Sequence, residues 1–503
     1  MDDAVHRIAG AWEFILPEIL LIVTAAAHFL VAPFLVNERG EAAPGLRHRF
    51  GGFALVMLGV ASWLWLGSRP ADAVSLGPFR LDDLTWFIRG LSLATGLILL
   101  LTTWNRVADA SAAEQHACLL LIVAGVSPIA AANDLVVLFL ALELVSIPTY
   151  VMLYLGRHDE QGLEATLKYF MLSIFSSAFV LFGLSYLYGV TGTTNLTAMT
   201  AALAGGGTSP MPSALSIAAA AVIAGLGFRI AAVPFHFYAP DVFQGTSNGG
   251  AAMLSISPKI AGFVALVRLL TGPVGEDALW TLGERVEPTL WLLAILGMTV
   301  GNVLAFVQTD VRRMMAYSSI AHAGYMLVGI AAAPHREAQV AGVPAVLFYL
   351  AVYGAMTLGV FAILAALSRQ RQPDSSASCA DDLAGLGRTN PAAAVLMTVF
   401  LVSLTGLPPT AGFLGKLNLL IAAWSAGTPA SRWAAALMAL NAAIAAWYYL
   451  RLVGVMYLQP APAAPRPRLE TVAFTGAALC AIATLGIFTA PDWLWHAALR
   501  AAS

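Results

Sequence analysis

Charge is scarce in this chain. Only 11% of its 503 residues are charged, whereas 59% are hydrophobic, and the mean hydropathy is +0.78. A composition this apolar excludes a soluble globular surface, so the sequence predicts an integral membrane protein. The formal net charge of −2 leaves no basic footprint, which excludes a nucleic-acid-binding surface.

Cysteine and lysine are also rare. The three cysteines, Cys118, Cys379 and Cys480, are scattered, so they form neither a disulfide framework nor the spacing of a metal site. A glycine-rich dinucleotide fingerprint is missing too, and the chain is expected to bind no NADH, flavin or iron–sulfur cluster itself. Three lysines stand against 23 arginines, and two of the three, Lys259 and Lys416, lie inside apolar stretches.

Long apolar runs make up most of the sequence. A membrane-spanning helix needs about 20 apolar residues, and fourteen segments of roughly that length follow one another. They are 14–36, 50–67, 85–104, 116–132, 134–155, 168–189, 214–234, 251–271, 289–308, 314–333, 344–368, 391–423, 432–457 and 470–489. Because these runs lack the alternation of barrel strands, we expect an all-α polytopic membrane protein with about 14 transmembrane helices.

The arginines and lysines between these segments predict the orientation. With the N-terminus outside, the inner loops carry fourteen basic residues and the outer side carries seven. Basic residues concentrate in cytoplasmic loops, so both termini are predicted to face outward.

Two segments contain prolines near their middles or ends. One break is expected at Pro234 and the other at Pro408-Pro409. Proline removes a backbone donor, which is tolerated at membrane depth only where protein or water satisfies the freed carbonyl. Paired breaks are typical of inverted-repeat transporters with a site near the membrane centre. We therefore expect flanking helices in 1–115, five-helix repeats in 116–271 and 289–457, and a linker with a last helix in 458–503.

Four charged residues lie within the apolar segments: Glu143, Arg229, Lys259 and Lys416. Charges at this depth are costly and usually functional. Glu143 lies nine residues after Asp134, about 13 Å along a helix. In the alternative interpretation, Glu143 forms a structural ion pair, and Lys259 and Lys416 extend to a membrane interface. Lysine can release a proton when desolvated, whereas arginine in practice cannot.

His322 lies in another apolar segment. An imidazole can carry protons near neutral pH, although a lone histidine in such a helix is often a hydrogen-bonded core residue. Glu18, Arg89 and Arg268 lie too near segment ends, or too far from other charges, to indicate a site.

Several phrases of the sequence resemble subunit N of proton-pumping NADH-quinone oxidoreductase, complex I, over about residues 10–460. The similarity rests on Ala141-Leu142-Glu143-Leu144-Val145-Ser146-Ile147-Pro148-Thr149-Tyr150, Leu167-Lys168-Tyr169-Phe170, Tyr188-Gly189-Val190-Thr191-Gly192-Thr193-Thr194, Val233-Pro234-Phe235-His236, Pro240-Asp241-Val242, Tyr317-Ser318-Ser319-Ile320-Ala321-His322 and Gly406-Leu407-Pro408-Pro409-Thr410-Ala411-Gly412-Phe413. Sister subunits L and M and Mrp-type cation/proton antiporters share the broken helices, but the Lys-Tyr-Phe and Tyr-Gly-x-Thr-Gly-Thr phrases favour subunit N.

The resemblance implies a multi-pass subunit of a bacterial inner membrane without cofactor of its own. NADH, flavin, iron–sulfur clusters and quinone would be bound by partner subunits, and other membrane-arm subunits would be its neighbours. Glu143 would tune a neighbouring lysine, Lys259 would be the central relay lysine, and Lys416 would be the terminal lysine that hands protons to the outer side. We add His322 to this relay because of its own chemistry. The alternatives are an Mrp-type antiporter subunit and a non-pumping scaffold paralogue.

Two departures from the family pattern stand out. Arg229 occupies the usual lysine position, and a guanidinium is too basic to accept and release a proton in turn. The phrase 244–250 stands where the family has Pro-Thr-Pro, so the turn into the next helix is altered.

Overall fold

The computed structural model describes residues 2–35, 42–70, 72–204, 212–271, 281–335, 340–367, 379–461 and 469–502. Its helices are α1 (Asp2–Val31), α2 (Leu46–Gly67), α3 (Asp83–Thr103), α4 (Ala112–Ala131), α5 (Leu135–Gly156), α6 (Glu160–Thr191), α7 (Leu196–Ala204), α8 (Pro212–Arg229), α9 (Ala239–Gly245), α10 (Asn248–Thr271), α11 (Thr281–Phe306), α12 (Val311–Ala332), α13 (Gly342–Leu367), α14 (Leu386–Thr389), α15 (Pro391–Thr405), α16 (Ala411–Ser425), α17 (Pro429–Leu458), α18 (Thr471–Thr489) and α19 (Asp492–Ala502). One short hairpin, β1 (Val74–Leu76) with β2 (Phe79–Leu81), precedes α3.

The helices confirm the predicted all-α polytopic class. Among the described residues, twelve helices are long and apolar enough to cross a membrane, and three shorter apolar helices cover Ser213–Arg229, Pro391–Thr405 and Ala411–Ser425. Every predicted segment coincides with a helix or with a broken pair. The count of fourteen stays a prediction, because the short helices do not reach the length of a span alone. Part of the linker predicted before the last helix, 462–468, lies outside the described residues.

Both predicted breaks are present. Helix α8 ends at Arg229, and irregular backbone follows until α9. Ala231 within it has a φ of 57°, a conformation that alanine rarely adopts. Helix α15 ends before Gly406, whose φ of +85° suits a residue without a side chain. Each break thus leaves the last carbonyls of a helix without partners in their own helix.

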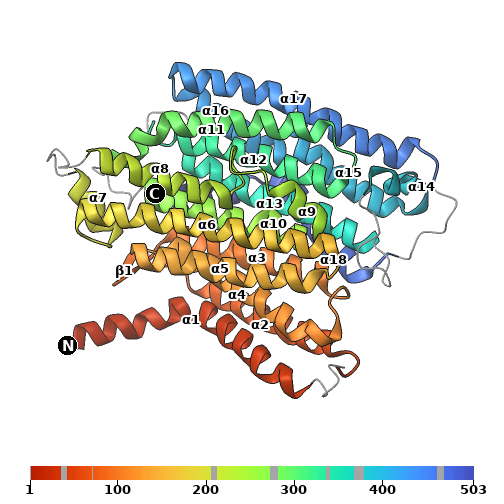
Figure 1. Cartoon of the computed structure of the whole chain (residues 1–503), viewed down its shortest axis with the longest axis horizontal. Coiled ribbons are helices and arrows are strands. Elements are labelled where there is room, and N and C mark those ends of the chain that lie inside the picture. The colour runs from red at the N-terminus through yellow and green to blue at the C-terminus, as the bar shows by residue number, and fades with distance from the viewer. Residues whose placement is uncertain are drawn as a thin grey trace.

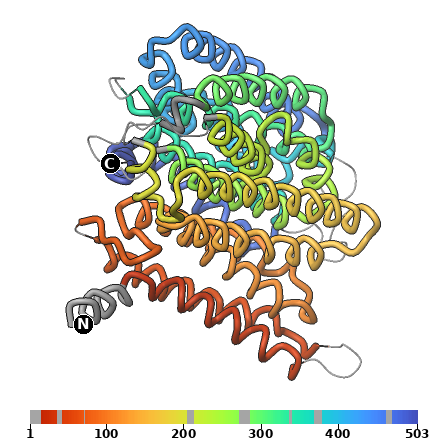
Figure 2. The backbone as a smooth tube through the Cα atoms, turned by 60° about the vertical axis from the view of Figure 1, so that its left-hand side comes forward, coloured from red at the N-terminus to blue at the C-terminus, as the bar shows by residue number. Residues whose placement is uncertain are grey.

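The helices run side by side, with α1 and α2 along one edge and α17 along the opposite edge (Figure 1). Helices α10, α12 and α13 lie between these edges (Figures 1 and 2). Nearly all of their residues are buried, whereas α1, α2 and α6 expose many apolar side chains. Polar groups on the three central helices therefore face protein rather than lipid.

The hairpin and α19 have no counterpart among the expected segments. Helix α19 is amphipathic: Leu494, Ala498 and Ala501 are buried, while Trp493 is exposed. It is too short to cross a bilayer. The hairpin shows little alternation of apolar and polar residues, and α19 is shorter than a spanning helix. An apolar run of about 20 residues therefore identifies neither of them.

Candidate functional site

Glu143 and Arg229 form a closed ion pair. Glu143 lies near the middle of α5, and Arg229 is the last residue of α8 before the break. The Nη2 of Arg229 lies 2.7 Å from the Oε1 of Glu143, with the side chains 5% and 21% exposed, respectively. Ser177 of α6 donates a hydrogen bond of 2.5 Å to the same carboxylate oxygen. These contacts connect α5, α6 and α8 through the carboxylate of Glu143.

The two Nη nitrogens of Arg229 make further hydrogen bonds, whereas its buried Nε has no partner among the described residues. Its Nη1 donates to the carbonyl of Leu142 at 3.1 Å and to the hydroxyl of Ser146, and its Nη2 donates to Ser177 at 3.1 Å. A planar guanidinium suits such a fixed fork. Because arginine stays protonated, this group can supply a constant positive charge but not a transferable proton.

Lys259 lies in the buried core on α10, where only 2% of the residue is exposed. Its Nζ donates to the Oγ of Ser319 on α12 at 2.6 Å. The hydroxyl of Tyr353 on α13 donates to the same oxygen at 2.9 Å. Ser319 therefore accepts from both groups, and the lysine does not extend toward an interface.

His322 lies one turn along α12 from Ser319 and is 1% exposed. Its Nδ1 is 2.6 Å from the hydroxyl of Tyr349, and its Nε2 is 3.2 Å from that of Tyr449. The hydroxyl of Tyr449 is also hydrogen-bonded to Ser318. Both ring nitrogens thus have partners that can either donate or accept, so this imidazole can take a proton on one side and give one up on the other.

Lys416 is bound at the second break. Its Nζ donates to the carbonyls of Leu404 and Thr405, each at 2.8 Å. These carbonyls belong to the last turn of α15, where the helix ends and a cation is favoured. A Cβ at Gly406 would lie 2.8 Å from the Cδ of Lys416, so glycine at the break provides the room that the lysine needs.

Tyrosine and asparagine side chains connect the Lys416 region with His322. The Nζ of Lys416 lies 5.0 Å from the ring centroid of Tyr325, a favourable cation–π distance. The amide nitrogen of Asn302 on α11 donates to the hydroxyl of Tyr325 at 2.8 Å, and its oxygen accepts from Tyr448 at 3.0 Å. Tyr448 precedes Tyr449, the partner of His322, and their rings lie 4.3 Å apart. The ring of Tyr353, the partner of Ser319, lies 5.1 Å from that of His322, so Lys259, His322 and Lys416 border one buried polar cluster.

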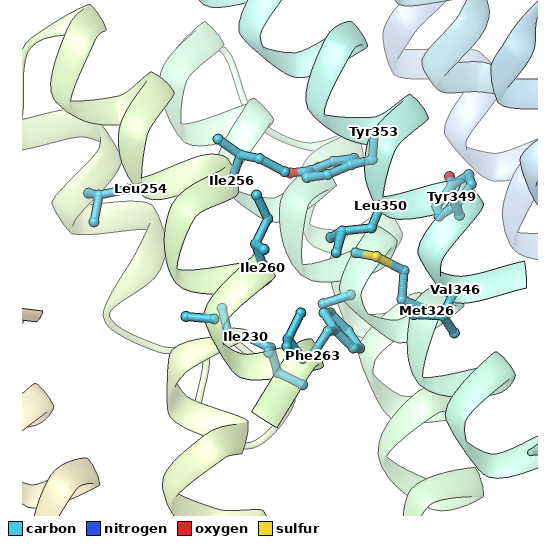
Figure 3. Packing of buried hydrophobic residues seen from close by; sticks show 14 of the residues in the cluster. Ile230, Leu254, Ile256, Ile260, Phe263, Met326, Val346, Tyr349, Leu350 and Tyr353 are labelled. Atoms are coloured by element: carbon cyan, nitrogen blue, oxygen red, sulfur yellow. The ribbon is translucent and has the colours of Figure 1, made fainter. Parts of the chain in front are cut away.

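The ion pair of Glu143 and Arg229 stands apart from that cluster. Within the described part of the chain, no hydrogen bond or ion pair connects it to Lys259. Ile230, which follows Arg229, belongs to the buried apolar packing with Ile260 and Phe263 of α10 (Figure 3). The expected relay, in which Glu143 tunes a basic neighbour and protons pass from Lys259 to Lys416, stays a prediction.

The sequence did not single out the hydroxyls and amides that join the three titratable residues. Tyr349 and Tyr353 are four residues apart on α13, an otherwise apolar helix, so their hydroxyls emerge on one face. Buried tyrosines usually find a hydrogen-bond partner. That spacing is a usable signal, but the partners come from helices distant in the sequence.

Charges near helix ends pair elsewhere. Arg89 lies 2.6 Å from Glu18, and Arg268 lies 2.7 Å from Asp82. These buried pairs join α1 to α3 and α10 to the start of α3.

Asp241 on α9 forms what we call the α9 cluster with Lys168 and Arg313. Its oxygens lie 3.1 Å from Lys168 and 2.7 Å from Arg313. Partial burial alone raises the pKa of Asp241, but the hydrogen bonds and charges of the two cations outweigh it and hold that pKa below its usual value. The cluster ties α9, next to the first break, to α6 and α12.

Comparison with known proteins gives consistent results. Residues 132–443 match the family described as NADH:quinone oxidoreductase/Mrp antiporter, TM. The chain is 36% identical to NADH-quinone oxidoreductase subunit N 1 of Solibacter usitatus, over 97% of this chain and 96% of that protein. It is 37% identical to NADH-quinone oxidoreductase subunit N of Trichlorobacter lovleyi, over 89% and 87%.

Solved structures agree in fold. A chain of respiratory complex I from Thermus thermophilus with bound aureothin is 29% identical with a TM-score of 0.77, covering 95% of this chain and 98% of that one. A chain of the Mrp complex from Dietzia sp. DQ12-45-1b reaches a TM-score of 0.79 at 21% identity, covering 96% and 97%. The latter shows the shared fold alone.

Proposed function

The chain belongs to the NADH:quinone oxidoreductase/Mrp antiporter family, among the N subunits of NADH-quinone oxidoreductase, and from this premise we propose that it translocates protons through the buried polar cluster around Lys259, His322 and Lys416. It is a membrane-arm subunit of that oxidoreductase. The observation that carries the proposal is the set of buried hydroxyl, imidazole and ammonium groups on α10, α12, α13, α16 and α17.

The contacts support a stepwise transfer. A lysine ammonium can release its proton when its stabilising partners change, and the first acceptor would be the hydroxyl of Ser319, whose Oγ lies 2.6 Å from the Nζ of Lys259. His322 can accept on one ring nitrogen and release from the other, because both face tyrosine hydroxyls. Lys416, held by helix-end carbonyls, would be the terminal site.

Glu143 and Arg229 would act by electrostatics rather than by transfer. The pair sits where the family has a glutamate and a lysine, and the arginine keeps its proton. Loosening or tightening the contact of 2.7 Å between them would change the field at the neighbouring helix α10. Protons would then enter the cluster by a route that does not pass through Arg229.

Electron transfer would take place in partner subunits. The described residues include no group of three or more histidine, cysteine, aspartate or glutamate side chains that could hold a metal ion, and the sequence has no dinucleotide fingerprint. We propose that NADH, flavin, iron–sulfur clusters and quinone bind elsewhere in the complex, and that this chain couples to them through its membrane-arm neighbours.

The orientation and repeat organisation extend the proposal. We place the chain in the bacterial inner membrane with both termini outside, in keeping with the basic residues of the inner loops. The breaks after α8 and α15 would occupy equivalent places in repeats 116–271 and 289–457.

The test is the proton-to-electron stoichiometry of the purified complex in proteoliposomes. Lys259→Ala is expected to reduce pumping strongly while the complex stays assembled, because it removes the central amine. Lys168→Ala serves as the control, because Lys168 is the one of the chain's three lysines that lies outside the buried cluster. Unchanged stoichiometry in Lys259→Ala would reject the relay. Sodium transport with intact NADH oxidation would instead favour an antiporter role.

A further inference from the structure

A large apolar cavity lies apart from the polar cluster, between α3, α13, α18 and α19. Its volume is about 630 Å³, within the range of pockets that hold whole ligands. Small residues on three helices leave this space, among them Ala94 of α3, Ala355 of α13 and Ala483 of α18. None of the three is fully buried, so the cavity opens onto the surface of the chain.

Two stacked tryptophans form a fixed wall of the cavity. The rings of Trp65 and Trp86 lie 4.8 Å apart. Each indole nitrogen donates to the other residue's carbonyl, at 2.9 Å and 3.2 Å. Gly90 packs directly against the ring of Trp65, where a Cβ would overlap it. The wall is therefore preformed, which lowers the cost of ordering on binding.

The mouth of the cavity combines aromatic and cationic side chains. Trp86 lies in the first turn of α3, and Trp493 and Arg500 lie on the exposed face of α19. The C-terminal end lies at the same end of the bundle as the hairpin and α7 (Figure 1). Tryptophan at this level is typical of a membrane–water interface. Arg500 is the one charged side chain among the described lining residues.

The cavity extends about as far as one leaflet is deep. Its lining on α3 runs from Trp86 to Ile98, which is about 18 Å at 1.5 Å per residue. Half of a hydrocarbon core is about 15 Å. A single lipid chain entering at the level of Arg500 would therefore end near the membrane centre.

We propose that this cavity binds one acyl chain of an anionic phospholipid, with the headgroup phosphate on Arg500. The interior favours an acyl chain over a quinone ring, because the described lining residues other than Arg500 and the tryptophans offer only the hydroxyl of Thr95 and the thiol of Cys480 as polar side-chain groups. Arginine binds phosphate with several donors in a fixed fork. The site is separate from the polar cluster and does not depend on proton transfer.

The experiment is photo-crosslinking of the assembled complex in vesicles with a phosphatidylglycerol that carries a diazirine on its acyl chain. Labelled peptides are mapped by mass spectrometry. We expect labels on α3, α13 and α18 in the lining range, and Ala94→Phe and Ala355→Phe should each reduce them at least threefold by filling the space. Ala436→Phe on the exposed face of α17 is the matched control.

Arg500→Gln tests the headgroup contact. It should lower labelling by the anionic probe about fivefold, as expected for one basic residue at an anionic membrane surface, and leave labelling by a phosphatidylcholine probe unchanged. Arg432→Gln, an exposed arginine at the start of α17, is the control. Labelling of Ala94→Phe and Ala355→Phe that is as strong as that of the wild type would overturn the proposal. So would displacement of the label by a quinone, or absence of label because a partner helix covers the mouth.

Discussion

Replacing Arg229 by lysine tests whether the first charged pair needs a guanidinium. Arg229 donates to Glu143, Ser146, Ser177 and the carbonyl of Leu142. A lysine has three donors and would lose about one of these contacts. A hydrogen bond of a charged group contributes about 1.5–3 kcal/mol. Because the Leu142 carbonyl also accepts from Ser146, we expect a loss of about 1–2 kcal/mol with the charge of the site preserved.

Pumping should survive that change. If Arg229 contributes only its positive charge, Arg229→Lys keeps the proton-to-electron stoichiometry of the wild type or raises it, since lysine adds a group that can transfer protons. Arg229→Met leaves the mostly buried carboxylate of Glu143 unpaired and should cost about 3 kcal/mol or more. Adding Glu143→Gln to it should restore most of that stability.

The measurements are pH-gradient formation per NADH oxidised in proteoliposomes and the thermal midpoint at which the subunit leaves the complex. A collapse of pumping in an assembled Arg229→Lys complex would refute the purely electrostatic role. Equal thermal midpoints for Arg229→Met alone and for the double variant with Glu143→Gln would refute the claim that the unpaired carboxylate of Glu143 causes the loss of stability.

Three further predictions concern other parts of the site. Gly406→Ala should cost about 1–2 kcal/mol, because of its left-handed backbone, and slow pumping, because its Cβ displaces Lys416; a wild-type rate and thermal midpoint would contradict this. Tyr449→Phe removes the hydroxyl beside His322, so single-turnover proton release should slow at least tenfold while stability changes by only about 1 kcal/mol; an unchanged release rate would exclude that hydroxyl from the path. Asp241→Asn should lower the thermal midpoint at pH 7. The folded pKa of Asp241 lies below its unfolded value of about 4, so the stabilisation exists above that value and disappears as the pH falls below it. The difference from wild type should shrink at pH 3, and a constant difference would assign the effect to packing.

Much of the fold could be predicted because it depends on local properties of the sequence. A helix in lipid must satisfy its own backbone groups, so apolar length alone indicates where each span lies. The breaks are equally local: Gly406 follows the end of α15 with a left-handed backbone, and Pro234 lies in the irregular backbone that follows α8. Helix α19 and the hairpin β1–β2 escaped prediction because neither has the length of a span.

The candidate site divides differently between sequence and tertiary structure. The sequence by itself placed Glu143, Arg229, Lys259, His322 and Lys416 within apolar segments, where the cost of burying a charge makes the four charged residues conspicuous. Only the tertiary structure decided their partners. Ser319 and the buried tyrosines meet because α12, α13 and α17 pack together, and helix packing depends on contacts between residues far apart in the chain. The packing of α5, α6 and α8 likewise closed the pair of Glu143 and Arg229 on itself, and apolar side chains of α10 pack beside it, which no local pattern specifies.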